Sequence, residues 1–171
     1  MLEFIQVEID NAINGESARI IAKMNSLVEP EIIKALFRAS QAGVRVDLIV
    51  RGICCLRPGI KGVSENIQVR SIIGRFLEHS RIFYFHNAGD IQIFGSSADW
   101  MDRNFFRRIE TCFPIEDKGM KKKVMKECLL NYLSDNTQSW ILQPDGNYKK
   151  SILAGKKEKS AQQKLLKNYT E

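Results

Sequence analysis

Hydrophobic residues recur at helical spacing over residues 2–13, and the pattern stops at Asn14-Gly15. Apolar positions three and four residues apart share one face of a helix, so we expect the chain to begin with an amphipathic helix. A second helix is expected from Pro30 to Gly43, because Pro is favoured in the first helical turn and acidic neighbours complement the positive end of the helix dipole. Each helix is followed by a segment with the pattern of a strand.

The first of these segments, residues 19–25, alternates along its length, and the second, residues 44–50, is β-branched and apolar on both faces. The second pattern is typical of an interior strand that helices cover on both sides. The order strand, helix, strand predicts a parallel pair joined by a right-handed crossover. The rest of the pattern predicts a long loop at 52–66, strands at 67–73, 81–85, 91–94 and 107–115, a loop at 96–106 and a helix at 121–133. The strands at 81–85 and 91–94 should form a hairpin, and the strand at 107–115 should be the last; the fold class is therefore α/β.

Composition narrows the class of protein. With 171 residues, 44% of them hydrophobic, the chain can bury a core without disulfides or a structural metal. No apolar stretch approaches the ~20 residues of a membrane span, and the acidic start does not resemble a signal peptide. The four cysteines show no CxxC spacing and there are two histidines, so we expect reduced thiols and no metal site in this chain. We expect a soluble, cytoplasmic protein.

The net charge of +6 is unevenly distributed. Residues 1–117 hold 14 basic and 15 acidic side chains, a net charge of −1, whereas residues 149–171 hold 7 and 2, a net charge of +5. Eleven of the 14 basic residues before position 118 are Arg, and all 12 from there onward are Lys. We therefore divide the chain into a domain at 1–148 and a Lys-rich tail at 149–171, partly helical or disordered.

Arg51-Gly52 is the strongest chemical signal, because it directly follows the interior strand at 44–50. Ligands of α/β sheets bind beyond the carboxyl ends of the strands, where a guanidinium can grip phosphate and a glycine lets the backbone approach it. The alternative is a structural ion pair between Arg51 and a nearby acid such as Glu65 or Asp47. The sequence leaves the two interpretations open.

A second signal combines Arg75, His79 and Arg81, two guanidiniums and an imidazole within seven residues. Arg binds phosphate oxygens through two N–H groups, and His can exchange a proton near neutral pH, so the group suits phosphoryl chemistry. Taken alone, His79 is more often an ordinary surface histidine. The lysines at 118–126 could form a nucleic-acid patch, but a solvated helix face is the better interpretation because no aromatic residues interleave with them.

Three segments together resemble a known family. They read DLIVRGICCLRPG (residues 47–59), SIIGRFLEHSR (71–81) and SSADWM (96–101), the last followed by Arg103-Asn104. They occur in the same order in the C-terminal catalytic domain of bacterial long-chain polyphosphate kinase, which this chain closely resembles. The resemblance implies a phospholipase-D-like mixed sheet flanked by helices. His79-Ser80-Arg81 resembles that superfamily's His-x-Lys motif with Arg for Lys, and Ser97-Ala98-Asp99 resembles its Ser-x-Asn motif.

The resemblance also implies a function. Enzymes of this family move the terminal phosphate of ATP reversibly onto polyphosphate, through a phosphohistidine and with Mg²⁺ that belong mainly to a preceding domain absent from this sequence. By the family pattern Arg51 and His79 match an ATP-binding arginine and histidine, and His79 would also act in catalysis. The remaining candidates would line a polyphosphate tunnel: Lys23, Arg75, Arg81, Arg107 and Arg108.

The expected partners are the preceding domain of the same polypeptide, ATP or ADP, and polyphosphate. A homo-oligomer of the full-length enzyme is compatible with this interpretation, as is its association with a membrane surface, whereas a specific nucleic acid is not expected. The chain alone should be inactive or nearly so. The alternatives are a phosphodiesterase of the phospholipase-D superfamily that acts as a dimer, and a non-enzymatic module that binds polyanions through its lysine tail.

Overall fold

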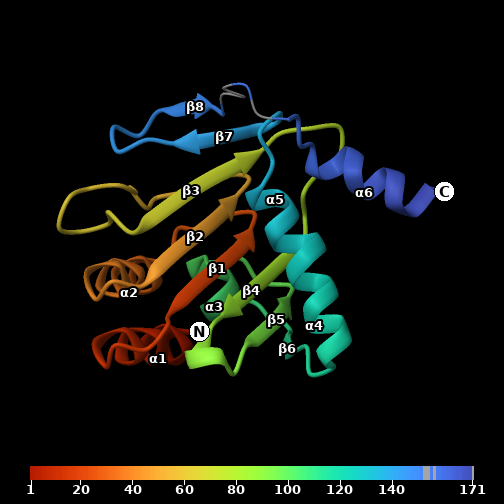
Figure 1. Ribbon diagram of the computed structural model, residues 1–171. Helices are drawn as coiled ribbons and strands as arrows, with labels where there is room; N and C mark the ends of the chain where they lie inside the picture. Colours follow the sequence, from red (N-terminus) through yellow and green to blue (C-terminus); the bar gives the residue numbers. More distant parts are fainter. Residues whose placement is uncertain (152–154, 156, 171) are drawn as a thin grey trace.

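An eight-stranded mixed sheet forms the centre of the computed structural model, which describes residues 1–151, 155 and 157–170 (Figure 1). The strand order is β6-β5-β4-β1-β2-β3-β7-β8. The strands are β1 (Arg19–Met24), β2 (Arg45–Val50), β3 (Ile67–Ile72), β4 (Arg81–Phe85), β5 (Gln92–Ser96), β6 (Cys112–Pro114), β7 (Ser139–Leu142) and β8 (Tyr148–Lys150). β1, β2 and β3 are parallel, and every other pairing is antiparallel. The expected α/β class, the parallel pair and the hairpin are confirmed.

Helices cover both faces of the sheet (Figure 1). They are α1 (Leu2–Ile13), α2 (Pro30–Gln41), α3 (Asp102–Phe106), α4 (Lys118–Val124), the π-helical segment η2 (Met125–Leu130), α5 (Asn131–Leu133) and α6 (Ala161–Thr170), with a single 3-10 turn, η1 (Asn87–Gly89). α4, η2 and α5 follow one another without a break, as the helix expected at 121–133. Two carboxylates cap helix starts: Glu29 accepts from the Ile32 N–H of α2, and Asp117 accepts from the Met120 N–H of α4.

The alternation along β1 shows why helices are needed on both sides. Ile20 and Ala22 belong to the larger core cluster, which α1 and α2 close on one face. Ile21, between them, packs with Leu129 of η2 on the other face. Successive side chains of a strand point to opposite faces, so an interior strand that is apolar throughout must be covered twice.

Three sequence expectations were wrong in detail. The segment at 96–106 is not all loop, because α3 forms within it. The strand expected at 107–115 is reduced to Cys112–Pro114, an edge strand that pairs only with the end of β5. It is also not the last strand: β7 and β8 follow it and extend the far side of the sheet beyond β3. Their three or four residues are too few to give a strand pattern; instead β7 is stabilised by pairing with β3, and β8 by pairing with β7.

The division after residue 148 stays a prediction. β8 runs across that position, and in the tail the helix α6 begins with Ala161 and Gln162, which are 1% and 5% exposed. The tail residues 152–154, 156 and 171 lie outside the described residues. Within the described part of the chain, no helix is both long and apolar enough to cross a membrane.

Candidate functional site

The carboxyl ends of the three parallel strands meet at one edge of the sheet, and the antiparallel neighbours bring two further segments there. Met24 pairs with Val50, so Asn25 and Arg51 follow side by side. β4 starts at this same edge and β5 ends there, because Arg81 pairs with Ser96. We call this region the strand-end edge. It collects Asn25, Arg51, the segment 73–80, Arg81 and the segment 96–99.

Arg51 is held in place by an amide rather than by a carboxylate. Its Nη2 and Nε donate to Oδ1 of Asn25 at 2.9 and 3.2 Å. The Asp47 carboxylate pairs instead with Arg19 and Arg45, and among the described residues no ion pair to Arg51 forms. The structural alternative for Arg51 is therefore not observed. Its guanidinium is oriented yet keeps its full charge and spare donors, the properties needed to bind an anion.

Gly52 lets the chain turn closely past β1 next to this arginine. A Cβ at this position would lie 2.9 Å from the carbonyl oxygen of Asn25, closer than side-chain carbons approach. The Gly52 N–H donates to that same carbonyl at 2.7 Å. A glycine is thus required at this strand end because two backbones pass close to each other. Beside it, a cavity of about 260 Å³ is lined by Arg51, Gly52 and Tyr148.

Asp99 joins the two motifs that resemble those of phospholipase D. Its two carboxylate oxygens each accept from Arg81, at 3.0 Å from Nε and 3.0 Å from Nη2. The Asn25 N–H donates to Asp99 Oδ1 at 2.7 Å, and Asp99 is 4% exposed. Burial by itself raises the pKa of Asp99, but the hydrogen bonds from Arg81 and the Asn25 backbone outweigh it and hold the pKa below its ordinary value. Arg81 is therefore engaged in a fixed pair, which in turn places Asn25 against Arg51.

His79 lies in the exposed part of the edge, two residues before Arg81. The Nη1 group of Arg81 donates to the His79 carbonyl at 3.2 Å, so the arginine pair with Asp99 also anchors the backbone of the histidine. No hydrogen bond to the imidazole forms among the described residues. The ring is exposed and directed by its backbone alone, as a group that meets a ligand from outside would be.

Lys23 occupies a different environment from the one expected for a tunnel wall. It is 3% exposed on the face of the sheet, its Nζ lies 2.8 Å from Glu78 Oε2, and it lies over the Tyr132 ring at 3.5 Å from the ring centroid. Burial lowers the pKa of Lys23, and the hydrogen bond that Lys23 donates to Glu78 acts in the opposite direction. The positive charge of Lys23 is therefore paired with Glu78 inside the protein.

The remaining candidates are arginines near the surface. Arg75 is exposed and lies over the ring of Phe76, with 5.4 Å between its Cζ and the ring centroid. Arg107 is exposed and contacts Asp102 at 3.5 Å, an ion pair of little energetic value at that exposure. Arg108 lines a cavity of about 320 Å³ that also borders Ser96 at the strand-end edge. The structure thus links Arg51 to Arg81 through Asn25 and Asp99, and links Arg81 to the His79 carbonyl. Arg75 lies on the same segment as His79.

Sequence reasoning missed three residues that organise this site. Asn25 could have been found, because it follows β1 as Arg51 follows the parallel strand β2. Glu78 and Gln162 gave no signal of their own: Gln162 Nε2 donates to Glu78 Oε1 at 2.6 Å across 84 positions of the chain. Contacts between segments so distant in sequence are created by the fold.

The described residues do not fit a magnesium site. Among them no group of three or more His, Cys, Asp or Glu side chains could hold a metal ion. Of the two carboxylates at the strand-end edge, Asp99 already receives hydrogen bonds from Arg81, Asn25 and Ser26, and Glu78 receives them from Lys23 and Gln162. Neither offers spare coordination to a cation.

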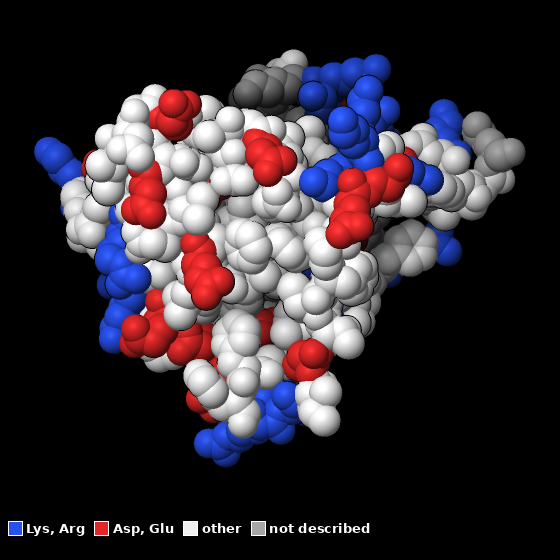
Figure 2. Space-filling model, turned by 90° about the horizontal axis from the view of Figure 1, so that it is seen from below, with Lys and Arg blue, Asp and Glu red and all other residues white. Residues whose placement is uncertain are grey.

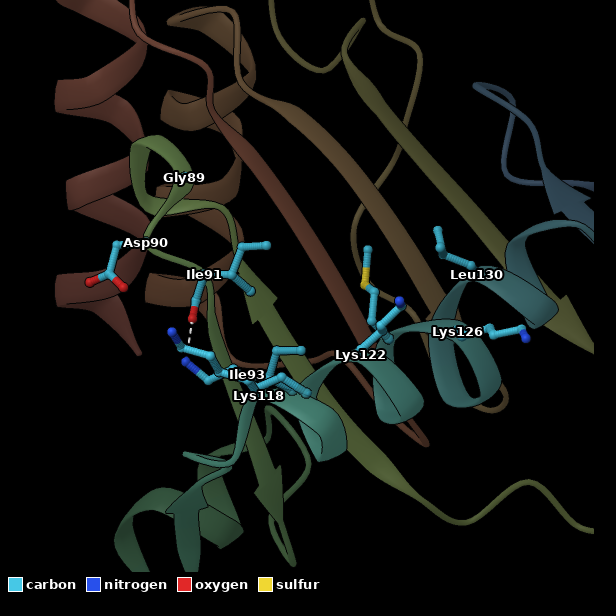
Figure 3. A pocket seen from close by; sticks show the side chains of 10 residues that line it. Gly89, Asp90, Ile91, Ile93, Lys118, Lys122, Lys126 and Leu130 are labelled. Atoms are coloured by element: carbon cyan, nitrogen blue, oxygen red, sulfur yellow. Dashed lines mark hydrogen bonds between the residues drawn. The ribbon is translucent and has the colours of Figure 1, made fainter.

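A further cavity, of about 580 Å³, lies away from the strand-end edge, where β5 begins (Figure 3). Ile91 and Ile93 face the helix formed by α4 and η2, and four lysines surround this apolar floor: Lys118, Lys121, Lys122 and Lys126. Lys121 donates to the Ile91 carbonyl at 2.6 Å. We call it the lysine-rimmed cavity.

Figure 2 shows another face, on which acidic side chains are scattered over an uncharged centre and Lys and Arg lie toward the margins.

Comparisons with known proteins identify the family of this chain. The family model described as polyphosphate kinase C-terminal domain 2 matches residues 1–162. The chain is 60% identical to a polyphosphate kinase of Pseudomonas syringae over 171 residues, which is 99% of this chain and 23% of that protein. A polyphosphate kinase of Pseudomonas aeruginosa is 61% identical over 150 residues, 88% of this chain and 22% of that protein. The chain thus spans about a quarter of the length of these relatives.

Solved structures give the same assignment. The crystal structure of polyphosphate kinase from Porphyromonas gingivalis superimposes with a TM-score of 0.92 at 39% identity, over 97% of this chain and 26% of that one. The phospholipase D family member Nuc from Salmonella typhimurium matches 71% of this chain and 82% of its own, with a TM-score of 0.50 at 16% identity. This second likeness shows the fold alone and confirms the expected phospholipase-D-like sheet. The chain belongs to the family of polyphosphate kinase C-terminal domains.

Proposed function

We propose that this chain supplies the residues that bind ATP and polyphosphate in a polyphosphate kinase, which transfers the terminal phosphate of ATP reversibly onto a polyphosphate chain. One observation carries the proposal: Arg51 is oriented by Asn25 at the strand-end edge and has no carboxylate partner there among the described residues. The phosphohistidine, the Mg²⁺ and the rest of the catalytic centre belong in this proposal to a preceding domain of the same polypeptide, in a cytoplasmic enzyme.

The residues of the chain act through position and charge. Phosphoryl transfer needs the reacting groups to be aligned and the charge on the equatorial oxygens to be neutralised. Arg51 binds two of those oxygens with its guanidinium, and His79 donates a hydrogen bond to the transferring group from the exposed side. Arg75, Arg107 and Arg108 are exposed cations for successive phosphates of the polymer. Lys23 and Arg81 act indirectly, because each is held in an internal ion pair.

The phosphodiesterase alternative receives less support from the same contacts. In the phospholipase-D motif that this chain resembles, the position of Arg81 is a lysine. Here its guanidinium is bound on two sides by Asp99, so it cannot meet a substrate phosphate without breaking that pair. Steady hydrolysis of bis(p-nitrophenyl) phosphate by the purified chain would favour this alternative over ours.

Calorimetric titration of the chain with ATP and with tripolyphosphate tests the proposal. Binding should also raise the melting temperature of the chain. Arg51→Ala and His79→Ala should each raise the dissociation constant roughly tenfold or more, since a charge-assisted hydrogen bond contributes about 1.5–3 kcal/mol. Arg38→Ala is the matched control, because Arg38 is an exposed arginine on α2 away from this edge. Unchanged binding in both site variants would contradict the assignment of the site.

A further inference from the structure

The segment that carries His79, residues 73–80, is poorly held by packing. It belongs to no helix or strand, and Ile73, Phe76 and Leu77 are 63%, 45% and 70% exposed. A segment with so few buried apolar contacts would open readily on its own. Its order must therefore come from specific polar contacts.

Gln162 provides three of them. It is 5% exposed and is the second residue of α6. Its Oε1 accepts from the Phe76 N–H at 3.0 Å, while its Nε2 donates to the Phe76 carbonyl at 2.8 Å and to Glu78 Oε1 at 2.6 Å. A glutamine amide offers both a donor and an acceptor, so it can hold both backbone polar groups of one residue, here the N–H and the carbonyl of Phe76. Gly74 completes the fit, because a Cβ there would collide with the amide oxygen of Gln162.

The start of α6 is itself firmly placed. Asp135 is 2% exposed, and its Oδ2 accepts from the Ala161 N–H at 2.7 Å. Asn131, in α5, donates to the Ala161 carbonyl at 3.0 Å. Asp135 follows α5 in the chain, so these bonds connect the first turn of α6 to the helix that covers the sheet. Gln162 therefore projects from a fixed support toward the His79 segment.

Glu78 receives a second contact from the opposite side. Lys23 of β1 lies 2.8 Å from Glu78 Oε2, and the two side chains are 3% and 10% exposed. Removing one partner of a buried ion pair leaves an uncompensated charge, so this contact resists opening. The residue immediately before His79 is thus held between α6 and the sheet, while Arg81 holds the His79 carbonyl from the other side.

We propose that α6 is a positioning element for His79 and that Gln162 is its positioning residue: by holding Phe76 and Glu78, Gln162 fixes the histidine in the place where it meets phosphate. The inference rests on the proposed function of His79. It assigns a role to a helix of the Lys-rich tail in which the sequence shows no motif.

Gln162→Met tests the proposal because it keeps the volume of the side chain and removes its hydrogen bonds. Gln163→Met is the matched control, since Gln163 is the exposed neighbour on the same helix. In Gln162→Met we expect amide hydrogen exchange at residues 76–79 to become at least about tenfold faster and the dissociation constant for tripolyphosphate to rise about 3–10-fold, the effect of losing one or two net hydrogen bonds. Gln163→Met should change neither. If Gln162→Met does not fold, Gln162→Asn, whose amide is one methylene too short, replaces it.

The double variant Gln162→Met/His79→Ala separates positioning from a general structural role. If Gln162 acts through His79, the double variant binds tripolyphosphate as His79→Ala does, because the two losses are not additive. Additive losses would overturn the proposal, and so would a Gln162 variant with wild-type exchange and affinity while His79→Ala is impaired. If instead exchange becomes faster in Gln162→Met but neither His79→Ala nor Arg51→Ala affects binding, the proposed function fails, and the proposal for Gln162 with it.

Discussion

The strand-end edge and the lysine-rimmed cavity are both basic, yet they are built differently. At the edge, Arg51 and Arg81 are fixed by hydrogen bonds to Asn25 and Asp99, beneath the open segment of His79. In the cavity, lysines surround an apolar floor, and of the four only Lys121 has a hydrogen-bond partner among the described residues. The two regions lie toward opposite ends of the sheet, because β4 begins at the first and leads to η1 at the second.

The difference shows that net charge does not locate an anion site. A guanidinium held by a planar contact presents its remaining donors in a defined direction, whereas an ammonium on a flexible stem remains hydrated and mobile. The segment up to residue 117 has a net charge of −1 and still contains the site that we propose for phosphate. We therefore expect the placement of a few arginines to matter more for anion binding than the total charge of the lysines, and four predictions test this comparison.

The largest effect should come from removing the carboxylate that organises the edge. Asp99→Ala leaves Arg81 without its partner, and the loss of one member of a buried pair costs about 3–5 kcal/mol of unfolding free energy. Asp117→Ala, which removes the helix cap beside the lysine-rimmed cavity, should cost only about 1 kcal/mol. Urea denaturation measures both, and similar losses would show that the two regions do not differ in rigidity.

The next effect compares the two kinds of cation. Arg51→Lys keeps the charge but loses the fork that contacts Asn25 and phosphate together, so tripolyphosphate affinity should fall about tenfold. The mirror-image change Lys122→Arg in the cavity rim should leave affinity within about twofold, since screening limits its influence at physiological salt. Isothermal titration gives both constants. An Arg51→Lys variant that binds as the wild type does would mean that charge alone is recognised.

The third effect, a change in the free energy of unfolding with pH, should be smaller than the first two and should occur only at acidic pH. The pKa of Asp99 is lower in the folded chain than in the unfolded chain, so its contribution is complete above an unfolded value of about 3.9 and is lost as pH falls through the lowered folded value. The stability difference between wild type and Asp99→Asn should therefore stay constant near neutral pH and shrink as the pH falls from about 4 through the lowered folded value. Urea titrations at several pH values measure it, and a difference that stays constant in acid as well would refute the role of Asp99 as a buried anion.

The smallest effect is expected from reversing charges in the cavity rim. The combined change Lys122→Glu and Lys126→Glu should alter tripolyphosphate affinity by less than about threefold at 0.15 M salt, because a Debye length of about 8 Å is shorter than the sheet that separates the regions. Titration against wild type provides the comparison. A tenfold loss of tripolyphosphate affinity would mean that the polyanion also binds at this cavity.

Much of the fold could be predicted because its early elements are long and have regular patterns. Residues 2–13 show a clear helical period and residues 44–50 form a β-branched apolar run, and both became the expected element within one or two residues. β7 and β8 were missed because so few residues carry no period, and neighbouring strands determine their pairing. Arg51 and His79 were proposed as site residues from their position beside strands and stay a prediction, whereas the residues that hold them in place, Asn25, Glu78 and Gln162, were not predicted.

By itself, the sequence determined the order of the early elements, the excess of arginine before residue 118 and the segments that resemble the polyphosphate kinase family. The tertiary structure decided which charges remain available. Lys23 and Arg81 are as basic in the sequence as Arg51, but Glu78 and Asp99 neutralise them, while Asn25 orients Arg51 without neutralising it. Whether a charged side chain stays available depends on its burial and on its hydrogen bonds to distant segments, and both arise only when the chain has folded.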